Sequence, residues 1–215
     1  MASNGLLLAR GPWSPDRVTA AWQERPFEPA AEQTAAADAA LSALRERGSP
    51  SHDGLAARLA DFAAREDGLH LDLQPARWAL RLVPGETVRS VSALCVVRDA
   101  GGRWLAGRRA PWLASWTGRW TLGAAGSVEV GEHPVATLTR ELEEEWSVAP
   151  ERLTIEALVC TPSGLVLLVG MAWLPAGAEV VPDDEHDAHA WWPAEQARWP
   201  EEAEEPIRRM ASLLA

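Results

Sequence analysis

The chain has 215 residues, of which 47% are hydrophobic, and it carries 20 basic against 31 acidic residues, a formal net charge of −11. This length and apolar content allow a substantial core and exclude global disorder, and the negative charge disfavours binding to a nucleic-acid polymer or an anionic membrane surface. No apolar stretch approaches a membrane span, so a cytoplasmic protein is expected.

The first 87 residues favour helices. Residues 28–48 contain strong helix formers and end at Gly48, which predicts a helix. Residues 54–66 place Leu55, Leu59 and Phe62 on one helical face, which predicts a second helix. Residues 69–73 alternate in the way that a strand does. The segment 1–87 is therefore interpreted as an N-terminal α+β extension of unknown role.

From residue 88 onward the hydrophobic pattern becomes that of strands. The predicted elements are strands at 88–99 and 103–109, a short strand entering a glycine-rich loop at 119–132, a hairpin at 152–161 and 165–174, and a terminal helix at 201–215. Strands and helices mixed in this way indicate either an α+β fold or an α/β fold of layered α/β/α type.

The clearest helical pattern covers residues 134–146. Pro134 suits the first turn, where its missing N–H costs no hydrogen bond. At about 100° per residue, one apolar stripe runs along the helix and would anchor it to the core. The residues of this stripe are Val135, Leu138, Leu142 and Trp146.

Three glutamates of the same helix, Glu141, Glu144 and Glu145, stand at i, i+3 and i+4 and are expected to share a different face. Their carboxylates repel one another, and near the C-terminal end they also oppose the helix dipole. A divalent cation such as Mg²⁺, which takes oxygen ligands, would relieve this cost. The alternative is a solvated acidic face, which is the commoner explanation of an acidic run taken alone.

The longer spacing pattern resembles the Nudix box, G-x5-E-x7-R-E-U-x-E-E-x-G-U, in which U is an aliphatic residue. The matching positions are Gly126, Glu132, Arg140, Glu141, Leu142, Glu144, Glu145 and Val148, while Ser147 replaces the second glycine. Residues 88–215 are thereby identified as resembling a Nudix hydrolase domain. The resemblance implies an α/β/α sandwich with a mixed sheet and hydrolysis of a nucleoside diphosphate linked to another group X.

The resemblance also implies roles for the residues of the box. The metal, Mg²⁺ or Mn²⁺, would be held by Glu141, Glu144 and Glu145, and Glu132 would support the loop or reach the metal through water. Arg140 is similar to the arginine that orients the box carboxylates. The expected catalytic residues are Glu141, Glu145 and Arg140.

The serine at position 147 departs from the box pattern but removes no ligand. Glycine at that position normally ends the helix with a positive φ angle. Serine in such a conformation is expected to cost about 1 kcal/mol.

Candidates for substrate binding lie outside the box. Arg108 and Arg109 would hold the distal phosphates, and Trp116 would stack on a base. The competing explanation for Trp116 and its neighbouring tryptophans is local packing.

The general base is either Glu141 or a group in residues 183–196, where Glu185 is the candidate. His186 and His189 are further alternatives, although an exposed loop position is favoured for both histidines.

Three functions are compared. The first is a hydrolase acting on a nucleotide sugar or related nucleoside diphosphate derivative, a small-molecule substrate, either as a monomer or as a homodimer. The second is a catalytically inactive Nudix-like ligand-binding or regulatory module. The third is a helical interaction protein with a solvated acidic face, which would not need Gly126 and Glu132 at their spacing. Residues 111–132 also resemble the isopentenyl-diphosphate isomerase branch of the family, which implies a catalytic cysteine just before the box. An isomerase is disfavoured because residues 121–127 contain no cysteine.

Overall fold

The computed structural model describes residues 6–49, 51, 53–83 and 88–214. An eight-stranded sheet forms its centre, in the order β1-β9-β10-β5-β6-β11, with β7 paired to β6 and β8 paired to β5. Its strands are β1 (Leu6–Trp13), β5 (Val91–Arg98), β6 (Trp104–Arg109), β7 (Trp120–Leu122), β8 (Ala124–Ser127), β9 (Arg152–Cys160), β10 (Val166–Trp173) and β11 (His186–Trp192). Because β10 runs parallel to β5 and antiparallel to β9, the sheet is mixed, as expected.

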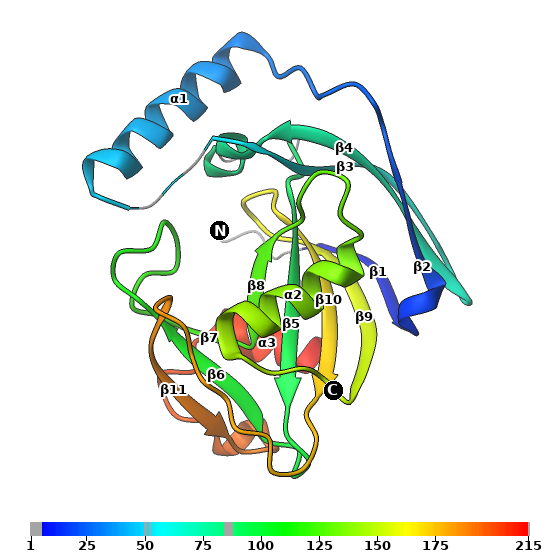
Figure 1. Ribbon diagram of the computed structural model, residues 1–215, viewed down its shortest axis with the longest axis vertical. Coiled ribbons are helices and arrows are strands. Elements are labelled where there is room, and N and C mark those ends of the chain that lie inside the picture. Colours follow the sequence, from blue (N-terminus) through cyan, green and yellow to red (C-terminus); the bar gives the residue numbers. More distant parts are fainter. Residues whose placement is uncertain (1–5, 50, 52, 84–87, 215) are drawn as a thin grey trace.

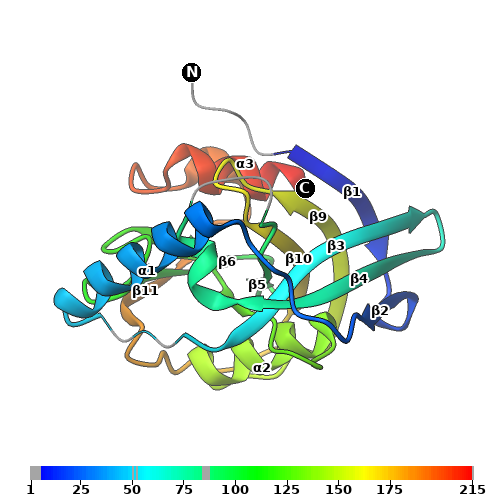
Figure 2. The same cartoon turned by 90° about the horizontal axis from the view of Figure 1, so that it is seen from above.

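Two helices cover opposite faces of this sheet, as Figures 1 and 2 show: α2 (Pro134–Trp146) on one side and α3 (Glu205–Leu213) on the other. Strand β5 lies between them, with Cys95 in the cluster under α2 and Val96 in the cluster under α3. A strand buried on both faces reads as a continuous apolar run, which explains the sequence of β5. The predicted α/β/α sandwich is confirmed.

Helix α2 has the predicted bounds. At its start, the backbone N–H of Val135 donates to Nδ1 of His133 at 3.3 Å, which satisfies one of the free amides of the first turn. Leu138, Leu142 and Trp146 of the apolar stripe are fully buried. The stripe therefore fixes which face of the helix is turned away from the sheet.

The N-terminal extension contains a second sheet of three strands, in the order β2-β4-β3. Its elements are η1 (Pro15–Arg17), β2 (Val18–Trp22), α1 (Ala31–Glu46), β3 (Leu55–Arg65), β4 (Gly68–Arg77) and η2 (Trp78–Leu82), and η3 (Gln196–Arg198) lies later in the chain. Helix α1 packs through Leu41 against Ala79 and Leu80. Strand β1 belongs to the large sheet, where it pairs with β9, so the extension and the sandwich share one sheet.

The helix predicted at residues 54–66 is wrong, because this segment is strand β3. Alanine and leucine favour a helix in isolation, but β3 pairs with β4 along its whole length. Leu59 is buried in that sheet whereas Leu55 is 52% exposed, so the two leucines do not share a buried face. Backbone pairing with a later strand overrides local propensity here.

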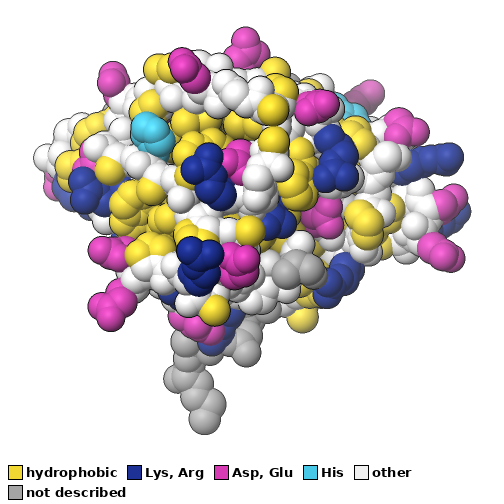
Figure 3. Space-filling view, turned by 90° about the horizontal axis from the view of Figure 1, so that it is seen from below, with side chains coloured by type: hydrophobic (Ala, Val, Ile, Leu, Met, Phe, Trp, Pro, Cys, Tyr) yellow, Lys and Arg dark blue, Asp and Glu magenta, His cyan; other side chains and the backbone are white. Residues whose placement is uncertain are grey.

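The other predicted elements are present, whereas strands β1, β2 and β11 were not predicted. Strands β9 and β10 form the antiparallel hairpin, and α3 lies within residues 201–215. In the described part of the chain, no helix combines the length and apolar character that crossing a bilayer requires. On the face in Figure 3, acidic and basic side chains are interspersed with apolar ones rather than gathered by sign.

Candidate active site

The site is built where β8 leads into the loop before α2. Gly126 lies in β8 against the side chain of Glu141, and a Cβ atom at this position would overlap the Glu141 carboxylate. The glycine therefore provides the space into which the buried glutamate points. This contact explains physically why the first position of the pattern and its first helical glutamate occur together.

Arg140 organises the carboxylates around the loop. Its Nε donates to Glu132 Oε1 at 2.9 Å, and its Nη1 lies 2.7 Å from Glu141 Oε1 and 2.8 Å from Glu144 Oε2. Its Nη2 also donates to the backbone carbonyl of Ser127 at 3.3 Å. One guanidinium thus links the loop to the helix and fixes the position of Glu141.

Glu132 is held as a carboxylate. Burial alone would raise its pKa, but the hydrogen bonds from Arg140 and from the backbone N–H of Glu129 outweigh this effect and keep the pKa below its ordinary value. Its contacts are those of a loop support, and its carboxylate faces the arginine.

Glu141 and Glu145 are buried, with 9% and 4% of their surface exposed. Burial raises the pKa of Glu141 to about 7, although the charge of Arg140 partly offsets this. Burial also raises the pKa of Glu145 well above its ordinary value, against a hydrogen bond from the amide of Ala125 to its Oε1 at 3.0 Å. Two carboxylates in one apolar environment are costly unless a cation or protons neutralise them.

Glu144 differs from the expectation that three carboxylates share one face. Its side chain is 57% exposed and pairs with Arg140, whereas Glu141 and Glu145 point inward. Among the described residues, no three His, Cys, Asp or Glu side chains are gathered closely enough to hold a metal ion. The arrangement therefore brings together two of the three predicted ligands.

The donor set nevertheless fits a hard cation. The Oε2 atom of Glu145 is buried and has no hydrogen-bond partner in the described structure. An orphaned carboxylate oxygen beside a second buried carboxylate, Glu141, is the chemistry that Mg²⁺ or Mn²⁺ requires. The backbone near Ala125 borders the same oxygens through its amide.

The segment before β11 closes over the end of α2. The amides of Val181 and Asp183 donate to the last carbonyls of α2, at Trp146 and Glu145, both at 2.9 Å. His186 then lies beside Trp146, with ring centroids 4.5 Å apart. Its Nε2 is 3.7 Å from Glu145 Oε2.

The expectation that His186 is an exposed loop residue is wrong. It belongs to β11 and is 6% exposed, and burial lowers its pKa in spite of a contact between its Nδ1 and Asp183 Oδ1 at 3.3 Å. A Cβ atom on Gly107 of β6 would overlap the ring, so glycine there makes room for it. Sequence reasoning lacked this information because the contact joins β6, α2 and β11.

The candidates outside the box occupy different surroundings. Arg109 is largely buried, and its Nη2 lies 3.2 Å from Glu185 Oε2. The charge of Arg109 partly offsets the rise that burial causes in the pKa of Glu145. Arg108 points to a more exposed position, where its Nε donates to Asp187 at 2.6 Å. The structure therefore brings Arg109 and Glu185 toward the carboxylates and pairs Arg108 at the rim.

Trp116 lies in the loop between β6 and β7. It is 39% exposed and has a φ angle of 58°. The guanidinium of Arg119 lies 4.4 Å from its ring centroid, and Arg119 also pairs with Glu204 at the start of α3. These contacts do not join Trp116 to the buried glutamates.

The N-terminal extension braces the box loop, which is residues 128–133 between β8 and α2. Sequence reasoning missed these contacts. The amide of Ala57 in β3 donates to the carbonyl of Val128 at 2.9 Å, and Nε1 of Trp22 donates to the carbonyl of Glu132 at 3.2 Å. Both contacts join residues that are distant in the sequence, so no local sequence pattern predicts them.

A family model of the NUDIX domain matches residues 88–214, more than half of the chain. The chain belongs to the Nudix family. This membership makes it a Nudix pyrophosphohydrolase, and hydrolases of the family generally act with a divalent metal ion such as Mg²⁺ or Mn²⁺. A search of curated proteins found no match.

The Nudix chain is also similar to solved structures. An Ap4A hydrolase from C. elegans, solved as a binary complex, has 24% identity over 57% of this chain and 92% of that chain, with a TM-score of 0.45. A MutT NUDIX hydrolase from Burkholderia pseudomallei has 23% identity over 59% of this chain and 98% of that chain, with a TM-score of 0.47. The NUDIX domain of Shewanella oneidensis NrtR, complexed with ADP ribose, has 18% identity over 59% of this chain and 89% of that chain, with a TM-score of 0.46.

The departure from the Nudix box at Ser147 is accommodated in the conformation that glycine would adopt. Ser147 has φ 55° and ψ 35°, and its amide donates to the carbonyl of Glu143 at 2.9 Å. The helix thus ends where the box requires, at the cost of a left-handed serine.

Proposed function

We propose that this Nudix hydrolase cleaves the pyrophosphate linkage of a nucleoside diphosphate derivative, a nucleotide sugar or a related small molecule, with Mg²⁺ or Mn²⁺. The observation that carries the proposal is the pair of buried carboxylates, Glu141 and Glu145, of which Glu145 has an oxygen without a hydrogen-bond partner. A protein that only needed a solvated acidic surface would have no reason to bury them.

Glu141 and Glu145 would hold the metal, with Glu144 turning inward from its exposed position. The bound ion would neutralise the charge of the pyrophosphate oxygens and favour attack by water. Arg140 keeps Glu141 in place and Glu132 fixes Arg140, so both act by positioning.

The other roles follow from position. Arg109, which is largely buried, would bind a phosphate of the substrate. Arg108, which is more exposed, would bind the part of the substrate that lies nearer the surface. The proton of the attacking water would pass to the carboxylate of either Glu141 or Glu185. Trp116 remains a candidate for stacking on a base.

The test compares wild type with Glu145→Gln on a panel of nucleoside diphosphate derivatives with Mg²⁺. Glu143→Gln is the matched control, because Glu143 is exposed on the same helix. Turnover by wild type and by the control that is lost in Glu145→Gln supports the proposal. Binding of these compounds without turnover in any variant would instead indicate an inactive ligand-binding module, and the absence of both rejects the proposed substrate class.

A further inference from the structure

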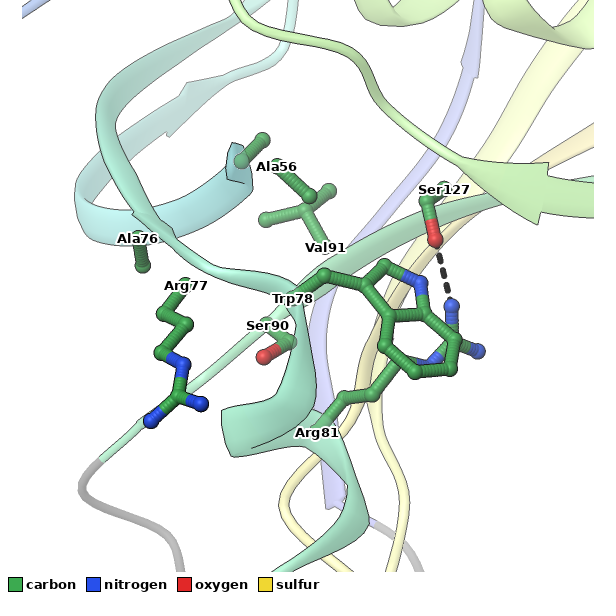
Figure 4. Close-up of a pocket in the computed structure, with 9 residues that line it drawn as sticks. Ala56, Ala76, Arg77, Trp78, Arg81, Ser90, Val91 and Ser127 are labelled. Carbon is green, nitrogen blue, oxygen red and sulfur yellow. Dashed lines mark hydrogen bonds between the residues drawn. The ribbon is translucent and has the colours of Figure 1, made fainter. Parts of the chain in front are cut away.

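A pocket lies where the N-terminal extension meets the box loop. Its lining includes Trp78 and Arg81 of η2 together with Ser127 of β8, which lie close to one another (Figure 4). Its free volume is about 10 Å³, close to the space that one water molecule needs. The pocket is therefore a small recess, and one group of a larger ligand would reach Arg81 only from its open side.

The guanidinium of Arg81 is the distinctive group in this pocket. It donates through Nη1 to Oγ of Ser127, the contact drawn as a dashed line in Figure 4, and it lies 5.4 Å from the ring centroid of Trp78. Within the described part of the chain, these neighbours are a hydroxyl and an indole, and Arg81 forms no ion pair. A partly buried charge without a counter-ion is costly, which points to an anionic ligand.

Arg77 lines the same pocket and provides the contrast. Its guanidinium forms ion pairs with Asp38 and Asp53, which neutralise its charge. Figure 4 shows that it extends away from Ser127, whereas Arg81 reaches toward it. Of these two arginines, Arg81 is the one with a charge available for a ligand.

The pocket adjoins the candidate active site. The carbonyl of Ser127 accepts a hydrogen bond from Arg140, and Arg140 in turn pairs with Glu141. Burial lowers the pKa of Arg81, the charge of Arg109 lowers it further, and the charge of Glu141 raises it. Arg81 is therefore an electrostatic neighbour of both the buried carboxylate and the second arginine.

We propose that Arg81 is a substrate-binding residue supplied by the N-terminal extension, and that its guanidinium binds a phosphate group of the substrate at the mouth of the pocket beside Ser127. The substrate class rests on the proposed function. A guanidinium offers parallel N–H donors that match two phosphate oxygens, which a hydroxyl acceptor does not fully use. The extension then completes the substrate site instead of merely covering the sheet.

The experiment compares Arg81→Gln with wild type and with Arg65→Gln. Arg65 is an exposed arginine at the end of β3, so the control removes the same charge from the same extension. The probe is inorganic pyrophosphate with Mg²⁺, measured by calorimetry, together with KM and kcat for a hydrolysed substrate. Arg81→Gln should raise both the Kd for pyrophosphate and KM about 10-fold to 100-fold, with a smaller effect on kcat. Arg65→Gln should leave them unchanged.

An unchanged Kd and KM in Arg81→Gln, or no pyrophosphate binding by wild type, overturns the proposal. A second outcome is that wild type hydrolyses no nucleoside diphosphate derivative but binds pyrophosphate more tightly than Arg81→Gln does. That outcome supports the phosphate subsite and rejects the proposed function. If Arg81→Gln lacks a thermal unfolding transition, Arg81→Lys replaces it. That variant keeps the charge but loses the parallel donors, so its Kd should still rise, and an unchanged Kd overturns the proposal.

Discussion

Replacing Glu141 by glutamine should remove a large part of the pH dependence of stability in the metal-free protein. Burial raises the pKa of Glu141 to about 7 from an ordinary 4.5. The folded protein therefore binds this proton more tightly than the unfolded chain does. The resulting stabilisation is fully present below about pH 4.5 and is lost as the pH rises through about 7.

The magnitude follows from the size of the shift. At about 1.4 kcal/mol per pKa unit, a shift from 4.5 to about 7 corresponds to about 3 kcal/mol. The side chain of Glu141 is only 11% exposed, so solvent screening reduces this figure little. Most of this loss of stability, about 2 to 3 kcal/mol, should occur between pH 5 and pH 8.

The assay is urea denaturation in the presence of a chelator at several pH values between 5 and 8. The free energy of unfolding of wild type should fall over this range by about 2 to 3 kcal/mol more than that of Glu141→Gln. Glu143→Gln, at an exposed position, should behave as wild type. Added Mg²⁺ at pH 8 should restore stability to wild type more than to Glu141→Gln, because a ligand that binds the folded state stabilises it. Equal pH dependence in wild type and Glu141→Gln would refute the reasoning.

Three further substitutions test other parts of the site. Gly126→Ala should displace the Glu141 carboxylate and reduce Mg²⁺ affinity, as measured by calorimetry; unchanged affinity contradicts the packing argument. Ser147→Gly should relieve the left-handed serine, stabilising the protein by about 0.5–1 kcal/mol and raising Tm by about 1–4 °C in thermal unfolding; a lower Tm contradicts this. Trp22→Phe should remove the hydrogen bond to the Glu132 carbonyl, cost about 1 kcal/mol in chemical denaturation, and speed amide exchange in residues 128–132; unchanged exchange contradicts a bracing role.

The sequence predicts best where local pattern and tertiary structure agree. Helix α2 has the predicted bounds because its apolar stripe, its N-terminal proline and the turn at Ser147 all indicate the same segment. Strand β5 is recognisable because both of its faces are buried. In such segments the residues near in sequence carry enough information to fix the element.

Prediction fails where distant segments decide. The segment of β3 has helix-forming residues, yet its backbone pairs with β4. Glu144 shares the helical spacing of Glu141 and Glu145, but Arg140 holds it at the surface. The burial of His186 depends on Gly107 of another strand, which no local spacing reveals.

Strand β1 has a practical consequence for anyone who expresses part of this chain. The family match begins at residue 88, but β9 needs β1 as its neighbour along the outer border of the large sheet. A fragment starting at residue 88 would leave the N–H and C=O groups of that border without partners, and such borders recruit other chains. The family match thus marks only where sequence similarity to relatives begins. A fragment cut at that residue would expose β9 and would be prone to self-association.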